Sequence, residues 1–107
     1  MEHIWDMLQD EANKTNCKKR SVACIIYDIT NKEVVSSGHN YHPDGECDCE
    51  STRTAIHAEQ HAVGTMLMKG KRLKGQLIAF INHAPCSNCA KVLNTYVSEV
   101  RYRPQKG

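Results

Sequence analysis

The sequence predicts an α/β fold in which helices pack on a mixed sheet of about four strands. Two apolar runs, at 22–29 and 77–81, are typical of strands that are covered on both faces. Segments with the apolar spacing of helices separate the later strands, so the order after the first helix is strand, strand, helix, strand, helix, strand. A chain of 107 residues has the size of one domain, and we expect residues 1–107 to form it.

A helix and a β-hairpin are expected in the first part of the chain. Ile4, Met7 and Leu8 fall at spacings of three and four, which predicts a helix from residue 3 to about residue 15. After this helix we expect a strand at 22–29, a turn at 30–32 and a second strand at 34–37 that pairs with the first. A loop rich in glycine, proline and polar residues is expected at 38–50.

The second part of the chain is expected to alternate between helices and strands. The pattern predicts a helix at about 57–69, a strand at 76–82, a second helix at 86–96 and a last strand at 97–103. Thr52 or Thr54 is the candidate cap of the first of these helices, and Gly70 ends it. The residues of that helix expected to face inward are Ala58, Ala62, Val63 and Met66.

Composition and charge narrow the classes of function. The chain is 24% charged and 6% aromatic, and its formal net charge of +2 is too small to indicate a nucleic-acid binder. No apolar run approaches the roughly 20 residues that span a membrane. The N-terminus lacks the basic start and apolar middle of a signal peptide. We therefore expect a cytoplasmic protein without a membrane partner.

Six cysteines in a small chain are compatible with a disulfide scaffold or with metal binding. The two-residue gap between Cys86 and Cys89, the presence of His57 and the missing export signal favour a metal site and free thiols.

Two short stretches carry the predicted chemistry: His57-Ala58-Glu59 and Pro85-Cys86-Ser87-Asn88-Cys89. His57, Cys86 and Cys89 supply one imidazole and two thiols, and three such ligands leave the fourth position of a tetrahedral zinc open for water. Water bound to zinc ionises near neutral pH and becomes a strong nucleophile. Glu59 is then the candidate general acid and base that moves protons. The competing interpretation is a structural zinc with Glu59 in solvent.

The spacing of these residues constrains the geometry of the site. His57 and Glu59 are two positions apart, so they would point to different sides of a regular helix. They can serve one site only if His57 starts the helix and the metal lies ahead of the first turn. Cys86 and Cys89 share one face of the next helix start, with Pro85 at its entry. The metal is therefore expected between two helix N-termini, whose partial positive charge favours thiolate.

At these residues the sequence resembles the cytidine and deoxycytidylate deaminase superfamily, and within it the deoxycytidylate (dCMP) deaminases. His-x-Glu followed by Pro-Cys-x-x-Cys is the signature of zinc deaminases. The resemblance implies a cytidine-deaminase-like, three-layer α/β/α fold. It also implies a truncated C-terminus, because relatives continue past the fourth strand with another strand and helix. Its order and spacing agree from about residue 4 to residue 103, and the stretches that carry it are 17–24, 38–43, 53–60 and 85–91.

The resemblance implies a zinc hydrolase that converts dCMP to dUMP and ammonia. In that interpretation Asn40 contacts the sugar, the backbone N–H of Ala58 binds the pyrimidine carbonyl, and Tyr102 lies beside the site. The alternative role of Asn40 is to form a turn, and the alternative role of Tyr102 is to pack at a sheet edge. Arg53 is the candidate phosphate ligand, because it lies close in sequence to the ligand helix.

A second set of cysteine and histidine residues allows two interpretations. Some dCMP deaminases carry a structural zinc in addition to the catalytic one, and four soft ligands would suit a closed site of that kind. The alternative is a pair of loop thiols, which the one-residue gap between the two central cysteines favours. The residues of this set are Cys17, His42, Cys47 and Cys49.

The sequence departs from the family pattern at two further points. His61 stands where relatives usually have Asn, which affects the shape of the pocket, and Tyr41 replaces the second glycine of a loop, which questions regulation by nucleotides. Two other functions stay open: a deaminase of cytidine, single-stranded DNA or RNA, and a non-catalytic zinc module. The small core and open sheet edge also predict a homo-oligomer.

Overall fold

The computed structural model describes residues 3–15, 21–41, 56–69, 76–85 and 87–103. These residues form three helices and a four-stranded sheet. The elements are, in chain order, α1 (His3–Ala12), β1 (Ala23–Asp28), β2 (Glu33–His39), α2 (Ala58–Met68), β3 (Leu77–Ile81), α3 (Ser87–Tyr96) and β4 (Glu99–Tyr102). None of the described helices is long and apolar enough to cross a membrane.

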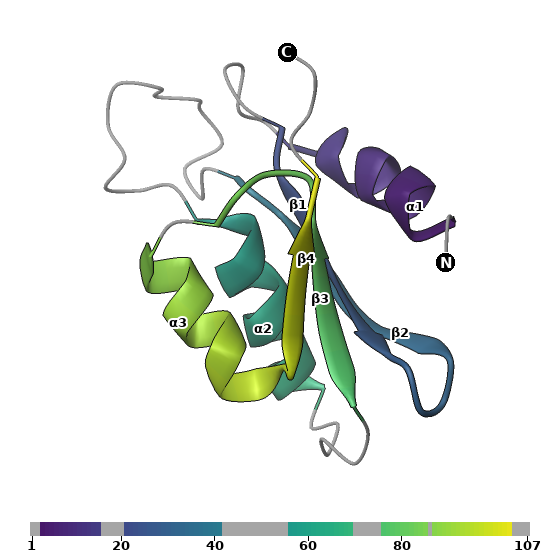
Figure 1. Cartoon of the computed structure of the whole chain (residues 1–107). Helices are drawn as coiled ribbons and strands as arrows, with labels where there is room; N and C mark the ends of the chain where they lie inside the picture. The colour runs from purple at the N-terminus through teal and green to yellow at the C-terminus, as the bar shows by residue number, and fades with distance from the viewer. Residues whose placement is uncertain (1–2, 16–20, 42–55, 70–75, 86, 104–107) are drawn as a thin grey trace.

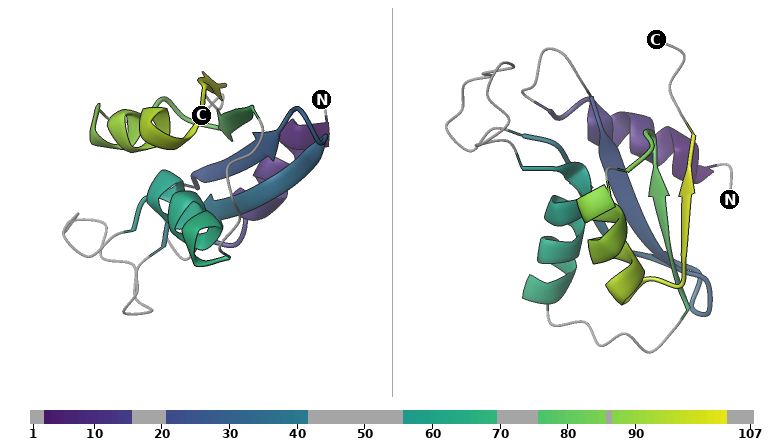
Figure 2. Two further views of the ribbon diagram at one scale, coloured as in Figure 1. Left: turned by 90° about the horizontal axis from the view of Figure 1, so that it is seen from below. Right: turned by 60° about the vertical axis from the view of Figure 1, so that its left-hand side comes forward.

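The elements are arranged in three layers, as Figures 1 and 2 show. The strand order is β2-β1-β3-β4; β1 is antiparallel to both of its neighbours, and β3 is parallel to β4. Helix α1 covers one face of this sheet, and α2 and α3 lie on the other. The mixed sheet and the three-layer α/β/α fold predicted from the sequence are therefore confirmed.

The two central strands are buried on both faces, because their side chains alternate between two cores. On β1, Cys24 and Ile26 belong to the core under α2 and α3, whereas Ala23 and Ile25 belong to the core under α1. Phe80 of β3 also faces α1, where the Trp5 ring packs edge-on against it at a centroid distance of 5.7 Å. The nearly continuous apolar runs of these strands thus have a direct structural cause.

Two local predictions were wrong. The loop predicted from Gly38 onward begins later, because Gly38 and His39 continue β2 and pair with β1. The structure also gives α2 the N-cap His57 in place of Thr52 or Thr54, which lie outside the described residues. At Gly38 the contact with α2 outweighs the local preference of glycine for loops. Four inward positions predicted for α2 are buried: Ala58, Ala62, Val63 and Met66.

Gly38 lets the first turns of α2 approach the backbone of β2. A Cβ atom at this position would lie 2.5 Å from the amide nitrogen of Ala62 and 2.8 Å from the carbonyl oxygen of Ala58. Both are backbone atoms of the helix, so a side chain cannot be accommodated by a simple rotation. The hydroxyl of Ser36, two residues earlier, adds a 2.7 Å hydrogen bond to the Ala62 carbonyl. This close contact fixes the start of α2, where the functional residues lie.

Gly38→Ala is expected to lower the free energy of unfolding by about 1–3 kcal/mol, because the new methyl group must push α2 away from β2. Urea unfolding of the purified variant measures this change. Gly64→Ala is the matched control, since a Cβ there meets nothing within 4 Å. In the interior of α2 the control should gain up to about 1 kcal/mol. Equal stability of Gly38→Ala and the wild-type chain would contradict the proposed packing.

Candidate active site

His57 lies at the N-cap of α2, outside the regular helix, with φ −75° and ψ 150°. Its backbone N–H donates to Oε1 of Gln60 at 3.2 Å, which closes the first turn back on the cap. The imidazole is exposed ahead of the helix, and Glu59 lies in the first turn behind it. The extended backbone at His57 is what lets two residues at i and i+2 face the same space.

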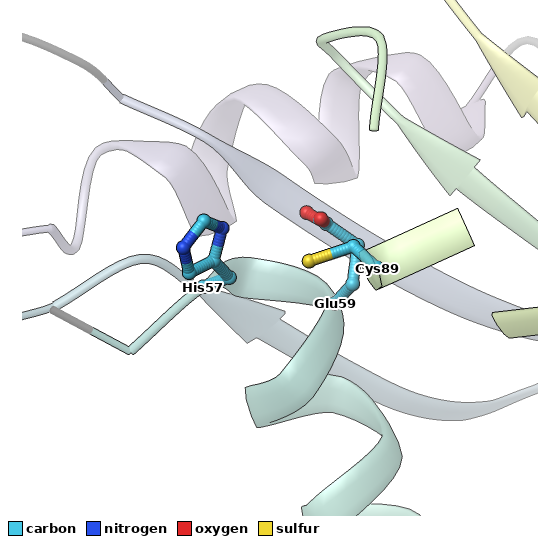
Figure 3. A group of neighbouring side chains, drawn as sticks. All are labelled: His57, Glu59 and Cys89. Atoms are coloured by element: carbon cyan, nitrogen blue, oxygen red, sulfur yellow. The ribbon is translucent and has the colours of Figure 1, made fainter. Parts of the chain in front are cut away.

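Three side chains converge from the starts of α2 and α3, as Figure 3 shows. The ligand atoms of His57, Glu59 and Cys89 all lie within 4.8 Å of one another. Glu59 is 3% exposed and Cys89 is 2% exposed, whereas His57 is open to solvent. Cys86, the remaining predicted ligand, lies outside the described residues. The structure therefore brings together the two stretches that the sequence singles out.

The donors in this group suit a zinc ion. Nitrogen from imidazole and sulfur from thiolate are the ligands that zinc takes most often, and a nearby carboxylate oxygen is also acceptable to it. Both helices begin at this point, and their N-terminal N–H groups carry partial positive charge that favours a thiolate and a carboxylate there. His57, Glu59 and Cys89 thus fit the ion that the sequence predicts.

Cys24 lies on β1 and is fully buried. Burial raises the pKa of its thiol well above the usual range, and the negative charge of Glu59 raises it further. The thiol therefore stays protonated and unreactive at neutral pH. It forms part of the apolar wall between the sheet and α2, together with Ala58 and Ala62.

The residues predicted to bind substrate have different positions. The Asn40 Oδ1 atom accepts a hydrogen bond of 3.0 Å from the Val22 N–H, so this side chain ties the end of β2 to the start of β1. Ala58 is the first residue of α2, and Tyr102 is the last residue of β4 and 53% exposed. Arg53 and the second set of cysteine and histidine residues lie outside the described residues: Cys17, His42, Cys47 and Cys49.

Sequence reasoning missed Asn82, which holds the end of β3 just before the segment that leads into α3. Its Oδ1 atom accepts from the Ala23 N–H at 2.8 Å, and its Nδ2 atom donates to the Ser21 carbonyl at 2.8 Å. The side chain is buried, and both partners are about sixty residues away in sequence. A polar residue at the end of an apolar strand was the available signal.

A second missed group contains Glu11, His39 and His61. Glu11 is buried although it is charged, and it contacts His39, which in turn contacts His61. The signal was present in the sequence, because Glu11 occupies one of the apolar positions in the helical pattern of the first segment. An acidic residue at such a position needs a buried donor.

Comparison with known families agrees with this geometry. The family model of the cytidine and deoxycytidylate deaminase zinc-binding region matches residues 1–102. The chain belongs to this deaminase family. Since the match includes α2, α3 and the segments that lead into them, the candidate active site lies within the region that defines the family.

Two curated relatives of this chain are named as deoxycytidylate deaminases. The protein from Saccharomyces cerevisiae is 30% identical over 108 residues, which cover 85% of this chain and 33% of the relative. The protein from Schizosaccharomyces pombe is 25% identical over 119 residues, which cover 94% of this chain and 35% of the relative. The chain thus spans about a third of the length of the curated relatives it matches.

Solved structures of dCMP deaminase from the cyanophage S-TIM5 share the fold. The apo form has a TM-score of 0.82 and 26% identity, over 98% of this chain and 82% of that chain. The form in complex with dCMP and dUMP has a TM-score of 0.77 and 23% identity, over 96% of this chain and 79% of that chain. The cytidine-deaminase-like fold expected from the sequence is therefore confirmed.

Proposed function

We propose that this chain is a zinc-dependent deaminase that hydrolyses the amino group of dCMP to give dUMP and ammonia. The observation that carries the proposal is the convergence of His57, Glu59 and Cys89 at the starts of two helices, with their ligand atoms within 4.8 Å. The names of the yeast relatives and the nucleotides bound to the cyanophage enzyme support dCMP as the substrate.

His57, Cys86 and Cys89 would hold one catalytic zinc ion, and the described pair already offers a nitrogen and a sulfur donor on facing helix starts. When bound, the ion would supply the Lewis acidity that makes water a competent nucleophile near neutral pH. For the set that contains Cys47 and Cys49, the one-residue gap favours loop thiols over a second, structural ion. Two zinc ions per chain in a metal analysis would overturn that preference.

Glu59 would move the protons of the reaction. Its carboxylate takes a proton from the attacking water as the new C–O bond forms at the ring carbon that bears the amine. It delivers this proton to the neighbouring ring nitrogen. It then takes the second proton from the newly formed hydroxyl and delivers it to the amine, so that the carbonyl forms, the C–N bond breaks and ammonia leaves. Burial of Glu59 against the sheet excludes bulk water from these transfers.

The substrate would be held by groups around the entrance to the site. Asn40 contacts the sugar, the Ala58 N–H at the start of α2 binds the pyrimidine carbonyl, and Arg53 binds the phosphate. Tyr102 would border the pocket from the end of β4, where it pairs with Ile81, the last residue of β3. We further propose that residues 1–107 act as one deaminase domain in a homo-oligomer.

A substrate panel tests the proposed function. Ammonia release and conversion of cytosine to uracil are measured with zinc-loaded protein on dCMP, dCTP, cytidine and a single-stranded oligonucleotide. The highest kcat/KM is expected for dCMP, because a nucleotide monophosphate fits both the sugar and phosphate contacts. A higher kcat/KM for cytidine or for the oligonucleotide would show that dCMP is not the preferred substrate. Zinc-loaded protein that deaminates none of the four would favour a non-catalytic module.

A further inference from the structure

A buried carboxylate lies on the face of the sheet opposite the candidate zinc ligands. Glu11, in the last turn of α1, is 8% exposed. Its Oε2 atom lies 2.5 Å from Nδ1 of His39, and its Oε1 atom lies 3.0 Å from the Ser37 hydroxyl and 3.3 Å from Nζ of Lys14. Burial raises the pKa of Glu11, but the hydrogen bonds from His39, Ser37 and Lys14 outweigh it, so the net pKa is lowered.

His39 connects this carboxylate to α2 across the end of β2. The His39 ring packs against the His61 ring at a centroid distance of 4.9 Å, and the Tyr41 ring packs against His61 at the same distance. Nδ1 of His61 lies 3.1 Å from both the amide nitrogen and the carbonyl oxygen of His39. One tautomer of His61 accepts from the amide and the other donates to the carbonyl, so both hold the ring in place.

The residues that pack on His39 also place the candidate metal ligand His57. Tyr41 and Ile56 exchange two backbone hydrogen bonds, of 3.1 Å and 2.8 Å, which fix the residue immediately before His57. The backbone N–H of His61 donates to the His57 carbonyl at 3.0 Å, which fixes the helix turn that follows it. The N-cap is therefore held on both sides by residues in contact with His39.

From these contacts we infer that Glu11 and His39 are positioning residues of the metal site, which act on His57 through His61 and Tyr41. This inference rests on the proposed function, because it requires zinc at His57. Without the Glu11 carboxylate the His39 ring loses the acceptor that holds it in place. His61 and Tyr41 then lose the fixed surface they pack on, and the N-cap can move. Zinc then binds a site that is no longer preorganised.

The zinc dissociation constant of the full chain tests this inference, and competition with a chromogenic chelator measures it. Glu11→Ala and His39→Ala are each expected to raise the dissociation constant about 10-fold, as loss of supporting contacts around metal ligands does in other proteins. The double variant should bind zinc no more weakly than either single variant, because the pair acts as one unit.

A conservative variant and a matched control separate positioning from general stability. His39→Asn keeps an amide nitrogen near the place of Nδ1, so it can still donate to Glu11 and should bind zinc more tightly than His39→Ala, although it lacks the ring that packs on His61. Ser37 lies on the same strand as His39 and also hydrogen-bonds Glu11. Ser37→Ala removes that bond but leaves the His39 side chain in place, so zinc affinity should not change. If His39→Ala does not fold, His39→Gln is used in its place. The longer side chain moves the amide donor away from Glu11, so the His39→Gln variant should bind zinc more weakly than the His39→Asn variant.

The outcomes distinguish this inference from the proposed function. Wild-type protein that binds no zinc would overturn both. Normal zinc binding and dCMP deamination by the wild-type chain, with unchanged affinity in both alanine variants, would overturn only the positioning role. Equal weakening in Ser37→Ala and Glu11→Ala would also overturn it, since the effect would then reflect general loosening of α1.

Discussion

Cys89→Ser is expected to abolish stoichiometric zinc binding and to reduce deamination of dCMP to the uncatalysed background. Cys89 is 2% exposed, and its sulfur lies within 4.8 Å of the ligand atoms of His57 and Glu59, so it is placed to bind the same ion. A serine hydroxyl has a similar shape, but it does not ionise near neutral pH and is a poor zinc ligand in place of thiolate. Metal analysis of the purified variant and the ammonia assay measure the two effects.

Cys24→Ala is the matched control for this variant. Cys24 is also buried and lies on the same face of the sheet, but its raised pKa keeps it a neutral thiol. Its removal should leave one zinc ion per chain at the catalytic site and retain deamination. A Cys89→Ser protein that keeps its full zinc content and turnover would refute the assignment of Cys89 as a ligand.

Glu59→Gln is expected to lower kcat about 10²–10⁴-fold while zinc stays bound, because the amide keeps the shape of the side chain but cannot take a proton from water. Glu59→Ala should behave in the same way. Zinc content and kcat measured on the same preparation distinguish the role of proton carrier from that of a third metal ligand. The position of the carboxylate among the ligand atoms makes this distinction necessary.

Glu33→Gln provides the control for removal of a negative charge. Glu33 is exposed at the start of β2, so its replacement should change neither zinc content nor kcat. If Glu59→Gln retained near-normal turnover with zinc bound, the proton-carrier role would be wrong. If it lost zinc and turnover together, Glu59 would be a ligand.

The sequence predicted the order of elements well, because its strongest signals are local. The apolar runs around Ile25 and Phe80 identified strands buried on both faces, and the structure shows a separate core on each side of them. The end of β2 was missed because the role of Gly38 depends on its contact with the Ala62 backbone, far along the chain. Glycine by itself is typical of a loop, and only the packed helix explains it here.

The candidate site could be predicted in part. The spacing of His57 and Glu59 indicated that the helix begins at His57, and the structure places the N-cap there. The supporting residues were not predictable in the same way. Asn82 and Glu11 are single polar residues whose partners lie in other elements, so their roles depend on tertiary contacts that periodicity does not encode.

The position of His61 against the backbone of His39 also bears on solubility. Strand β2 is at the end of the described sheet, where unpaired amide and carbonyl groups can recruit a strand from another molecule. In either tautomer, Nδ1 of His61 hydrogen-bonds one of the two backbone groups of His39 on that side, and the flanking Tyr41 ring packs against the imidazole. Substitution of His61 by a small apolar residue would therefore uncover a template for aggregation, even in a molecule that is otherwise correctly folded.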